Sequence, residues 1–414
     1  MNLSYPNEIE LCLDLLNNEY EAYIVGGAVR NKIMDLPCLD YDITTSATPN
    51  QILEVFKDYR VFLSGIIHGS VEVLIDKTLI QITSYRIESQ YLDHRHPKEI
   101  EFTTDIKKDL IRRDFTINTL CYNNKDKILD HFNALNDLEN KILKTINEPN
   151  ETFKQDPLRI LRAIRIASQL NFEIDKDTKN AIHNNIESLQ YVTNTRFSIE
   201  FLKFIESYKF CEYIKEYADV FSYFIPELNI LINNKDTFEK SLESINNTTN
   251  LKYRMALLFV NLNPNSSIQS SSSFIMMAKR LNFNNEVTST VARFIQNAYI
   301  EMINDKPLLK KRLNQFGDSF FEFLDFRSTY DLNPKQFKDI SSTIARIIEN
   351  NECCSLKQLN INGDDLKEIG ITGSQISLTL NKLLDLVIHG KVVNNKYKLL
   401  DSVTLLQKQK KLAK

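Results

Sequence analysis

Residues 23–49 read YIVGGAVRNKIMDLPCLDYDITTSATP, and this stretch decides the fold of the first part of the chain. A short apolar run leads into Gly26 and Gly27 and then into a segment of helical character that carries Arg30. A glycine pair at a strand-to-helix turn lets backbone N–H groups approach an anion, and Arg30 adds a fixed cation. The turn therefore predicts phosphate binding, with an ordinary tight turn as the alternative interpretation.

Two aspartates, Asp40 and Asp42, follow this turn and directly precede Ile43 and two threonines. In a strand, residues two apart point to the same face, where two carboxylates repel each other unless a cation lies between them. Mg²⁺ binds carboxylate oxygens together with substrate phosphates. Such a pair after a phosphate turn is what a nucleotidyl-transfer site needs, because metal ions activate the attacking hydroxyl and steady the leaving pyrophosphate. A solvated turn with two acidic residues is the alternative.

The composition makes the glycine pair more informative. The chain has 414 residues, a net charge of −3 and nine glycines. At an average usage of roughly 7%, a chain of this length would carry about 29. A glycine-poor chain should keep glycine mainly where the backbone needs a positive φ or a close approach to a ligand. The length predicts roughly three domains with ample core.

Several classes are excluded by what the sequence lacks. It has no apolar run of 18 residues, so we expect no transmembrane helix and no membrane contact. Its N-terminus has no basic segment followed by an apolar one, so a secretory signal is not expected. The six cysteines show no metal-binding spacing, which predicts free thiols and a cytoplasmic location. The slight acidity predicts that any RNA contact comes from local basic patches.

The coarse organisation is a head of mixed strand and helix signals followed, from about residue 141, by helical periodicity. Strands are predicted at Ile24–Val25, Val71–Ile75 and Leu79–Ser84. Helices are predicted at Glu8–Leu16, Gln51–Phe56, Leu158–Leu170, Phe197–Tyr208, Arg254–Leu262, Asn284–Ala298, Phe337–Glu349 and Gln375–Leu386. We interpret residues 263–267 and the serine run Ser270–Ser273 as breakers. The predicted fold class is α+β.

Residues 111–120, IRRDFTINTL, place two arginines and an aspartate before an apolar run. Arg112 and Arg113 are candidates to clamp phosphates, and Asp114 is a candidate to accept a hydrogen bond from a ribose hydroxyl. The alternative is a helix start with an aspartate near its N-cap.

The ordered motifs VGGAVRN, LDYDITTSATP, LIRRDFTINTL, DHFNALNDLENKIL and QDPLRILRAIRIA resemble the class II nucleotidyltransferases. These are the tRNA nucleotidyltransferases, or CCA-adding enzymes, and the related bacterial poly(A) polymerases. The match is close over residues 20–205. The helical remainder resembles the tail of the compact bacterial CCA-adding enzymes. The resemblance implies a nucleotidyltransferase-type head at 1–140, a helical neck with a nucleotide-reading helix at 141–208, a helical body at 209–300 and a tRNA-binding helical tail at 301–414.

The resemblance also implies roles for particular residues. Asp40 and Asp42 would be catalytic and hold Mg²⁺, and Asp114 would lie near the sugar. The nucleotide would be bound by Gly27, Arg30, Arg113, Asp156, Arg159, Arg162 and Arg165.

The Asp156 and Arg159 assignment has a chemical rationale. The two residues are three apart around Pro157, which suits the first turn of a helix, so their side chains can reach one neighbourhood. Cytosine and adenine each offer an amino donor beside a ring-nitrogen acceptor, whereas guanine and uracil offer a ring N–H beside a carbonyl. An aspartate acceptor beside an arginine donor thus suits C and A, and misplaced buried polar groups cost about 1–3 kcal/mol each. The alternative for Arg159 and its neighbours is a solvated basic face.

The chain departs from the family pattern at a few positions. Asn31 stands where the family usually has Asp, Gln155 where Glu precedes the base-reading aspartate, and Thr195 where a Glu-Arg-x-x-x-Glu motif begins. Asn133 and Ala134 replace a usual glycine pair. The change at Gln155 removes a negative charge. The selectivity for the base, or the switch from adding C to adding A, could therefore differ from that of the family.

Residues 91–99, YLDHRHPKE, resemble the flexible loop that the family links to addition of the final A, which argues against an enzyme restricted to CC. We therefore expect a cytoplasmic, Mg²⁺-dependent CCA tRNA nucleotidyltransferase. It would add C, C and A to the tRNA 3′ end from CTP and ATP without a nucleic-acid template and release pyrophosphate. An A-adding, CC-adding or poly(A)-synthesising variant and a nonenzymatic RNA-binding protein are the alternatives, and oligomerisation is left open.

Overall fold

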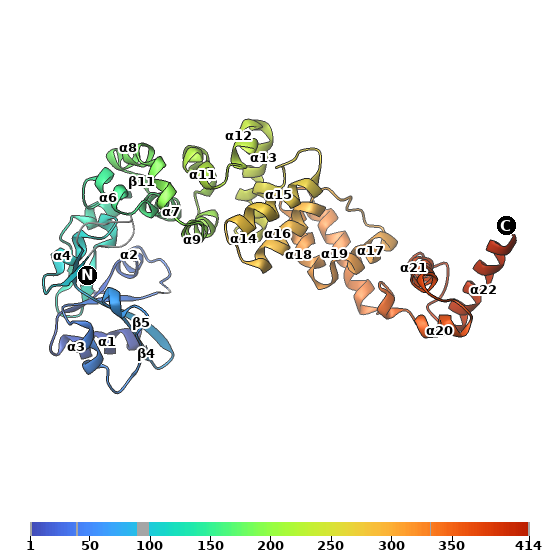
Figure 1. Cartoon of the computed structure of the whole chain (residues 1–414), viewed down its shortest axis with the longest axis horizontal. Helices are drawn as coiled ribbons and strands as arrows, with labels where there is room; N and C mark the ends of the chain where they lie inside the picture. The colour runs from blue at the N-terminus through green and yellow to red at the C-terminus, as the bar shows by residue number, and fades with distance from the viewer. Residues whose placement is uncertain (1, 39, 89–98, 332, 413–414) are drawn as a thin grey trace. The chain divides into compact units, whose positions relative to one another are not determined.

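The structure is a computed structural model that describes residues 2–38, 40–88, 99–331 and 333–412 (Figure 1). The chain forms two compact units. The first comprises residues 1–235 and 275–288, and the second comprises residues 236–274 and 289–414. Among the described residues, no helix combines the length and the apolar character needed to cross a membrane. The finer division into head, neck, body and tail stays a prediction.

A mixed sheet organises the first part of unit 1. In the described residues its strand order is β3-β4-β5-β2-β1-β8-β9. The strands are β1 Ala22–Val25, β2 Asp42–Thr45, β3 Arg60–Phe62, β4 Ser70–Ile75, β5 Thr78–Ser84, β8 Cys121–Asn123 and β9 Lys127–Leu129. A separate pair is formed by β6 Arg86–Glu88 and β7 Ile100–Phe102. The three strands predicted from the sequence are confirmed.

Helices cover both faces of the central strand β1, which is why all four of its residues are buried. Tyr23 and Val25 pack with Ile106 and Leu110 of the helix Ile106–Ile111, and the first helix packs on the opposite face. The helices of this part are α1 Asn7–Asn17, α2 Gly27–Ile33, α3 Pro49–Val55, α4 Ile106–Ile111 and α5 Ala134–Glu139. A strand buried on both faces is the rigid support that a site at its end requires.

The register of the sheet places the phosphate turn beside an aspartate. β1 and β2 are antiparallel, and Val25 at the end of β1 pairs with Asp42 at the start of β2. Gly26 follows Val25 immediately, so the glycine turn and Asp42 lie at the same edge of the sheet. Because β2 begins at Asp42, Asp40 lies in the loop before the strand and not within it, which corrects the expectation drawn from their spacing.

The next segment of unit 1 is helical apart from a short parallel pair, β10 Ile142–Leu143 and β11 Glu173–Ile174. Its helices are α6 Pro149–Gln155, α7 Leu158–Leu170, α8 Lys176–Asn184, α9 Asn194–Ile205, α10 Phe210–Glu216, α11 Ala218–Phe224 and α12 Leu228–Asn233. Helix α7 has the predicted bounds. Helix α9 begins three residues earlier than predicted, because Thr193 caps it by accepting a hydrogen bond from the Arg196 N–H.

Aromatic stacking fixes α9, the helix that packs against α7. Phe197 stacks on Phe224 with ring centroids 4.1 Å apart, and Phe204 stacks on Phe221 at 4.5 Å. Phe201 lies between them and is also buried. This cluster anchors α9 so that its polar face is presented to α7 in a fixed register.

Unit 2 is built from helices, with α15 and α16 shared between the units. They are α13 Lys235–Asn246, α14 Leu251–Phe259, α15 Ser267–Arg280, α16 Asn285–Asn297, α17 Lys306–Phe316, α18 Phe320–Ser328, α19 Pro334–Glu349, α20 Gly363–Glu368, α21 Ser374–Ile388 and α22 Lys396–Leu412. The helices predicted in this region are found, and the breaker between α14 and α15 is confirmed. The predicted α+β class is confirmed by the mixed sheet of unit 1 and these helices.

The prediction that Ser270–Ser273 interrupts helical structure is wrong, because the run lies inside α15. The hydroxyls find partners that are compatible with a helix. Ser270 accepts from the Asn263 N–H at 2.8 Å, Ser271 donates to the Ala292 carbonyl at 2.8 Å, and Ser272 donates back to its own helix. Serine disfavours helices by competing for backbone groups, and these contacts remove that competition.

Candidate active site

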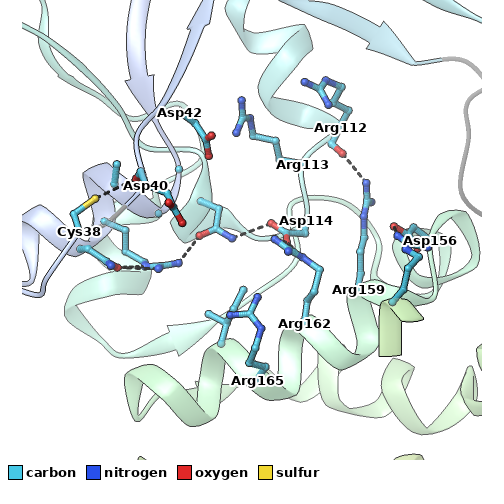
Figure 2. A pocket seen from close by; sticks show the side chains of 18 of the residues that line it. Cys38, Asp40, Asp42, Arg112, Arg113, Asp114, Asp156, Arg159, Arg162 and Arg165 are labelled. Atoms are coloured by element: carbon cyan, nitrogen blue, oxygen red, sulfur yellow. Dashed lines mark hydrogen bonds and ion pairs between the residues drawn. The ribbon is translucent and has the colours of Figure 1, made fainter. Parts of the chain in front are cut away.

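A cavity of about 750 Å³ lies in unit 1, and all nine residues predicted as site residues line it (Figure 2). They are Gly27, Arg30, Asp40, Asp42, Arg113, Asp156, Arg159, Arg162 and Arg165. Among the described residues that line the cavity, eight are arginines and five are carboxylates. Such an excess of cations attracts an anionic ligand with several charges, such as a polyphosphate.

The glycine turn forms one wall of the cavity. Gly26 has φ +75°, a conformation that favours glycine, and its N–H donates to the Leu120 carbonyl at 3.1 Å. A Cβ at Gly26 would lie 3.7 Å from Nη1 of Arg113, which is an ordinary contact. The backbone conformation, and not a lack of space, therefore requires glycine at this position.

Asp40 and Asp42 have carboxylates that face the cavity. In the described part of the chain, no side chain forms a hydrogen bond or an ion pair with either carboxylate. Desolvation within the concavity raises the pKa of Asp42; Arg113 opposes this rise and the charge of Asp40 adds to it. Figure 2 shows Asp42 and Arg113 facing each other. Two adjacent carboxylates, one of which raises the pKa of the other, are the oxygen donors that a hard divalent cation takes, so this pair fits a metal ion.

A chain of hydrogen bonds joins the phosphate turn to α7. Arg30 donates from Nη1 to Oδ1 of Asn118 at 2.6 Å, and Asn118 donates from Nδ2 to Asp114 at 2.9 Å. Asp114 in turn accepts from Nε and Nη2 of Arg162 at 2.8 and 2.7 Å. Both ends of the Asn118 amide and both oxygens of Asp114 are thus engaged. The carboxylate that was expected near the sugar thus holds Arg162 directly and Arg30 through Asn118.

Charge and burial act together on this chain. Burial lowers the pKa of Arg30 to about 10, which still leaves it charged near neutral pH. Burial alone would raise the pKa of Asp114, but Arg162 holds it well below its usual range. The same ion pair raises the pKa of Arg162. All three groups are therefore ionised at neutral pH, and the cations remain available to an anionic ligand.

Asp156 and Arg159 lie around the first turn of α7, as predicted. Arg196 of α9 forms a bidentate pair with Asp156 at 2.8 and 3.2 Å, and the Leu158 N–H adds a third hydrogen bond. Arg159 donates from Nη2 to the Arg112 carbonyl at 2.7 Å, whereas its buried Nη1 has no partner among the described residues. A buried donor without a partner points to a ligand that supplies an acceptor.

The interpretation of Arg159, Arg162 and Arg165 as a solvated basic face is wrong. Arg159 is buried, and the side chain of Arg165 is only 12% exposed. Arg165 donates from Nε to Glu200 of α9 and from Nη1 to Gln169, while Arg162 contacts Asp114 and Glu200. The aromatic anchoring of α9 fixes Glu200 and Arg196, and through them three side chains of the cavity.

The two arginines of residues 111–120 are arranged differently from one another. Arg112 binds Asp109 at 2.7 Å and Glu88 at 3.0 Å. Arg113 lies on the side of Asp42, and its buried Nε has no partner among the described residues. Of the pair, Arg113 is the one placed to meet a ligand beside the aspartates.

The family departures have local explanations. Asn133 adopts φ +58°, so it takes the left-handed position of a usual glycine. Asn31 accepts from Arg30 at 2.8 Å, Thr195 contacts Asn282, and Gln155 is exposed at the end of α6. The segment compared with a flexible loop, with His94 and His96, lies outside the described residues except for Glu99.

Sequence reasoning gave no role to several residues that shape the cavity. Asn118 is one, although it lies within the motif IRRDFTINTL. Asp109 is another, and its spacing of three and four from Arg112 and Arg113 on a helix was the available signal. Arg196 and Glu200 were visible only as a motif, because their contacts to α7 depend on tertiary packing.

Comparison with known families gives two matches. Residues 22–144 match the family described as the Poly A polymerase head domain. Residues 171–231 match the family described as a probable RNA and SrmB-binding site of polymerase A.

Two of the curated relatives are similar along nearly the whole chain, and a third is similar along about half of it. The CCA-adding enzyme of Ligilactobacillus salivarius is 31% identical over 424 aligned residues, which cover 98% of each chain. That of Bacillus velezensis is 29% identical over 96% of this chain and 97% of its own. That of Staphylococcus epidermidis is 41% identical over 189 residues, a match that spans about half of its length, 47%.

Solved structures share the fold. The Bacillus stearothermophilus CCA-adding enzyme in complex with CTP has a TM-score of 0.78 at 23% identity, covering 98% of this chain and all of that one. The Thermotoga maritima CCA-adding enzyme complexed with tRNA has a TM-score of 0.60 at 20% identity, covering 98% and 97%. The arrangement of the mixed sheet and the helices is therefore common to these chains.

Proposed function

The chain belongs to the family of CCA-adding enzymes, which are nucleotidyltransferases, and on this premise we propose that it adds C, C and A to the 3′ end of tRNA from CTP and ATP. The observation that carries the proposal is the lining of one cavity. It brings together two carboxylates, a set of arginines and a pair of groups suited to a base edge. The six cysteines are free thiols, in keeping with the proposed cytoplasmic location.

The reaction requires a hydroxyl of the tRNA 3′ end to attack the α-phosphorus of the nucleotide while pyrophosphate leaves. Nucleotidyltransferases of this family are metal-dependent, and we propose Mg²⁺, held by Asp40 and Asp42. Bound there, it would lower the pKa of the attacking hydroxyl and neutralise charge on the phosphates. Arg113, which faces Asp42, would bind the phosphate chain from the other side.

Arg30 would add a second contact to the phosphates. Its guanidinium is held by Asn118 and Asn31, so little side-chain entropy is lost when a phosphate binds. Arg162 and Arg165 are held in a similar way by Asp114 and Glu200. Cations that are already fixed by the protein stabilise developing charge without reorganisation at the moment of reaction.

Base selection would follow from the hydrogen-bonding capacity left at Asp156 and Arg159. Asp156 has three hydrogen bonds from the protein, which leaves an oxygen lone pair for one further donor. Arg159 has the free donor Nη1. The amino group and ring nitrogen of cytosine or adenine satisfy this pair, whereas uracil and guanine oppose it. The selection of C and A would thus need no nucleic-acid template.

The test is to incubate the purified protein with tRNA transcripts that lack CCA and to sequence the products. CTP alone should give CC, both nucleotides should give CCA, and a transcript that already ends in CCA should stay unchanged. Addition of A alone, CC alone or a run of A would identify the corresponding variant of the family. Incorporation of neither nucleotide would overturn the proposed reaction and leave RNA binding as the remaining function.

A further inference from the structure

A carboxylate outside the cavity organises the arginines that line it. Asp109 of α4 is completely buried. One oxygen, Oδ1, accepts from Arg112 at 2.7 Å and from the backbone N–H of Arg86 at 3.3 Å. The other, Oδ2, accepts from Nη2 of Arg113 and from the hydroxyl of Thr44, both at 3.3 Å. Four groups from three parts of the fold thus converge on one side chain.

Asp109 must be ionised for this arrangement to hold. Burial alone would raise its pKa, but Arg113 and Arg112 outweigh burial and lower it. A buried charge is tolerated only when it is paired and hydrogen-bonded, and removal of one partner leaves the others uncompensated. The carboxylate is therefore the anionic centre on which the two arginines depend.

The position of Arg113 connects Asp109 to the cavity. Its Nη2 contacts Asp109, and its Nη1 lies beside the glycine turn, 3.7 Å from the Cβ that Gly26 lacks. Thr44, whose hydroxyl is shared at 3.3 Å between the same oxygen of Asp109 and the Thr83 carbonyl, lies two residues after Asp42 in β2. Residues two apart in a strand share a face. One oxygen of Asp109 thus sets the distance between Arg113 and the strand that carries Asp42.

We propose that Asp109 is a positioning residue for the phosphate chain of the nucleoside triphosphate, acting through Arg113. It does not line the cavity, so it has no direct contact with the substrate. Its effect is to hold Arg113 opposite Asp42, where the phosphates would lie between an arginine and the carboxylate pair. The inference rests on the proposed function, because it takes Arg113 to be a phosphate ligand.

The decisive variant is Asp109→Asn, which keeps the shape of the side chain and removes its charge. We expect the KM for CTP to rise about tenfold, the effect of one misplaced charge-assisted hydrogen bond. The KM for tRNA and kcat should stay within about twofold, because a phosphate contact made equally in the ground and transition states affects binding alone. A variant that is merely less folded would lower the apparent kcat and leave the KM for CTP unchanged.

Asp137→Asn is the matched control. Asp137 of α5 accepts from the Thr116 hydroxyl at 2.6 Å, lies in the same unit and does not line the cavity. Asp137→Asn should leave both KM values unchanged.

If Asp109→Asn does not fold, Thr44→Val provides the second measurement, since it removes one donor from Oδ2 of Asp109 and keeps the carboxylate. It should raise the KM for CTP about two- to threefold. An unchanged KM for CTP in the folded variant, or equal rises for CTP and tRNA, overturns the proposal.

Calorimetric binding of inorganic pyrophosphate separates this inference from the proposed reaction. Pyrophosphate should bind the unaltered protein and bind Asp109→Asn about tenfold more weakly, whether or not the protein adds nucleotides to tRNA. Equal affinity in both proteins would reject the positioning role. If the unaltered protein incorporates neither CTP nor ATP into tRNA, the proposed reaction is rejected instead.

Discussion

At Asp42, burial and neighbouring charge set the protonation of a single carboxylate. Desolvation raises its pKa, Arg113 opposes the rise, and Asp40 adds to it. The folded protein therefore holds a proton at Asp42 more tightly than the unfolded chain does. Without a metal, stability from this group is present at acidic pH and is lost as the pH rises through the interval between the two pKa values. A bound cation reverses this cost, because it stabilises the ionised form.

This balance predicts how Mg²⁺ should stabilise the protein. The rise in melting temperature on addition of Mg²⁺ should be larger at about pH 8 than at about pH 5, where protons compete for the carboxylates. Asp42→Asn should abolish the rise, together with incorporation of CTP. Asp58→Asn, at an exposed carboxylate outside the cavity, should keep both. The measurement is a thermal unfolding series with and without Mg²⁺, and a rise that survives in Asp42→Asn would contradict the metal role.

Individual residues also show where glycine scarcity was informative. Gly26 and Gly69 have φ angles of +75° and +77°, in the left-handed region that favours glycine. Elsewhere the chain places asparagine in the left-handed region, as at Asn133 and at Asn171, which ends α7. Asparagine tolerates that conformation better than most residues. The glycines could be predicted to mark positions that need backbone freedom, but the asparagines could not, because many others in this chain have ordinary conformations.

At the scale of elements, patterning predicted which segments are helices and strands better than where they begin. Helix α7 has its predicted bounds because its apolar stripe is long and its ends are marked by Pro157 and Asn171. The nine site residues were predicted because they lie in ordered motifs. The contacts that hold these residues, such as the ion pair of Arg196 with Asp156, could not be predicted from the sequence. They join α9 to the start of α7 across 40 residues, so they depend on tertiary packing.

The serine run in α15 failed as a predicted breaker, and the reason gives a test. Ser271 is buried and donates to the Ala292 carbonyl at 2.8 Å, whereas Ser272 is exposed and donates to its own helix. Ser271→Ala should lower the free energy of unfolding by about 1 kcal/mol. Ser272→Ala should raise it by about 0.5 kcal/mol, because alanine is the better helix former. Urea denaturation of both variants checks this, and a loss of stability in both would contradict it.

At the scale of the whole molecule, the division into two units separates the cavity from much of the helical chain. The described residues that line the cavity all lie between Gly26 and Arg196, within unit 1. The helices from α17 to α22 belong to unit 2, and α20 to α22 have an apolar cluster of their own, with Leu366, Leu383 and Leu399 fully buried. Binding of a nucleotide should therefore raise the local stability of one unit and leave that of the other unchanged.

Hydrogen exchange with CTP and Mg²⁺ tests this separation. A ligand at about 100 times its Kd stabilises the state it binds by about 2.7 kcal/mol, so amides that exchange through opening of unit 1 should slow about a hundredfold. The slowing should appear in β2 and α7 and be absent from α17 to α22. UTP at the same concentration should protect less, because its ring N–H and carbonyl oppose Asp156 and Arg159. Equal slowing in α17 to α22 would show that the two units open as one, and equal protection by UTP would show that these residues do not read the base.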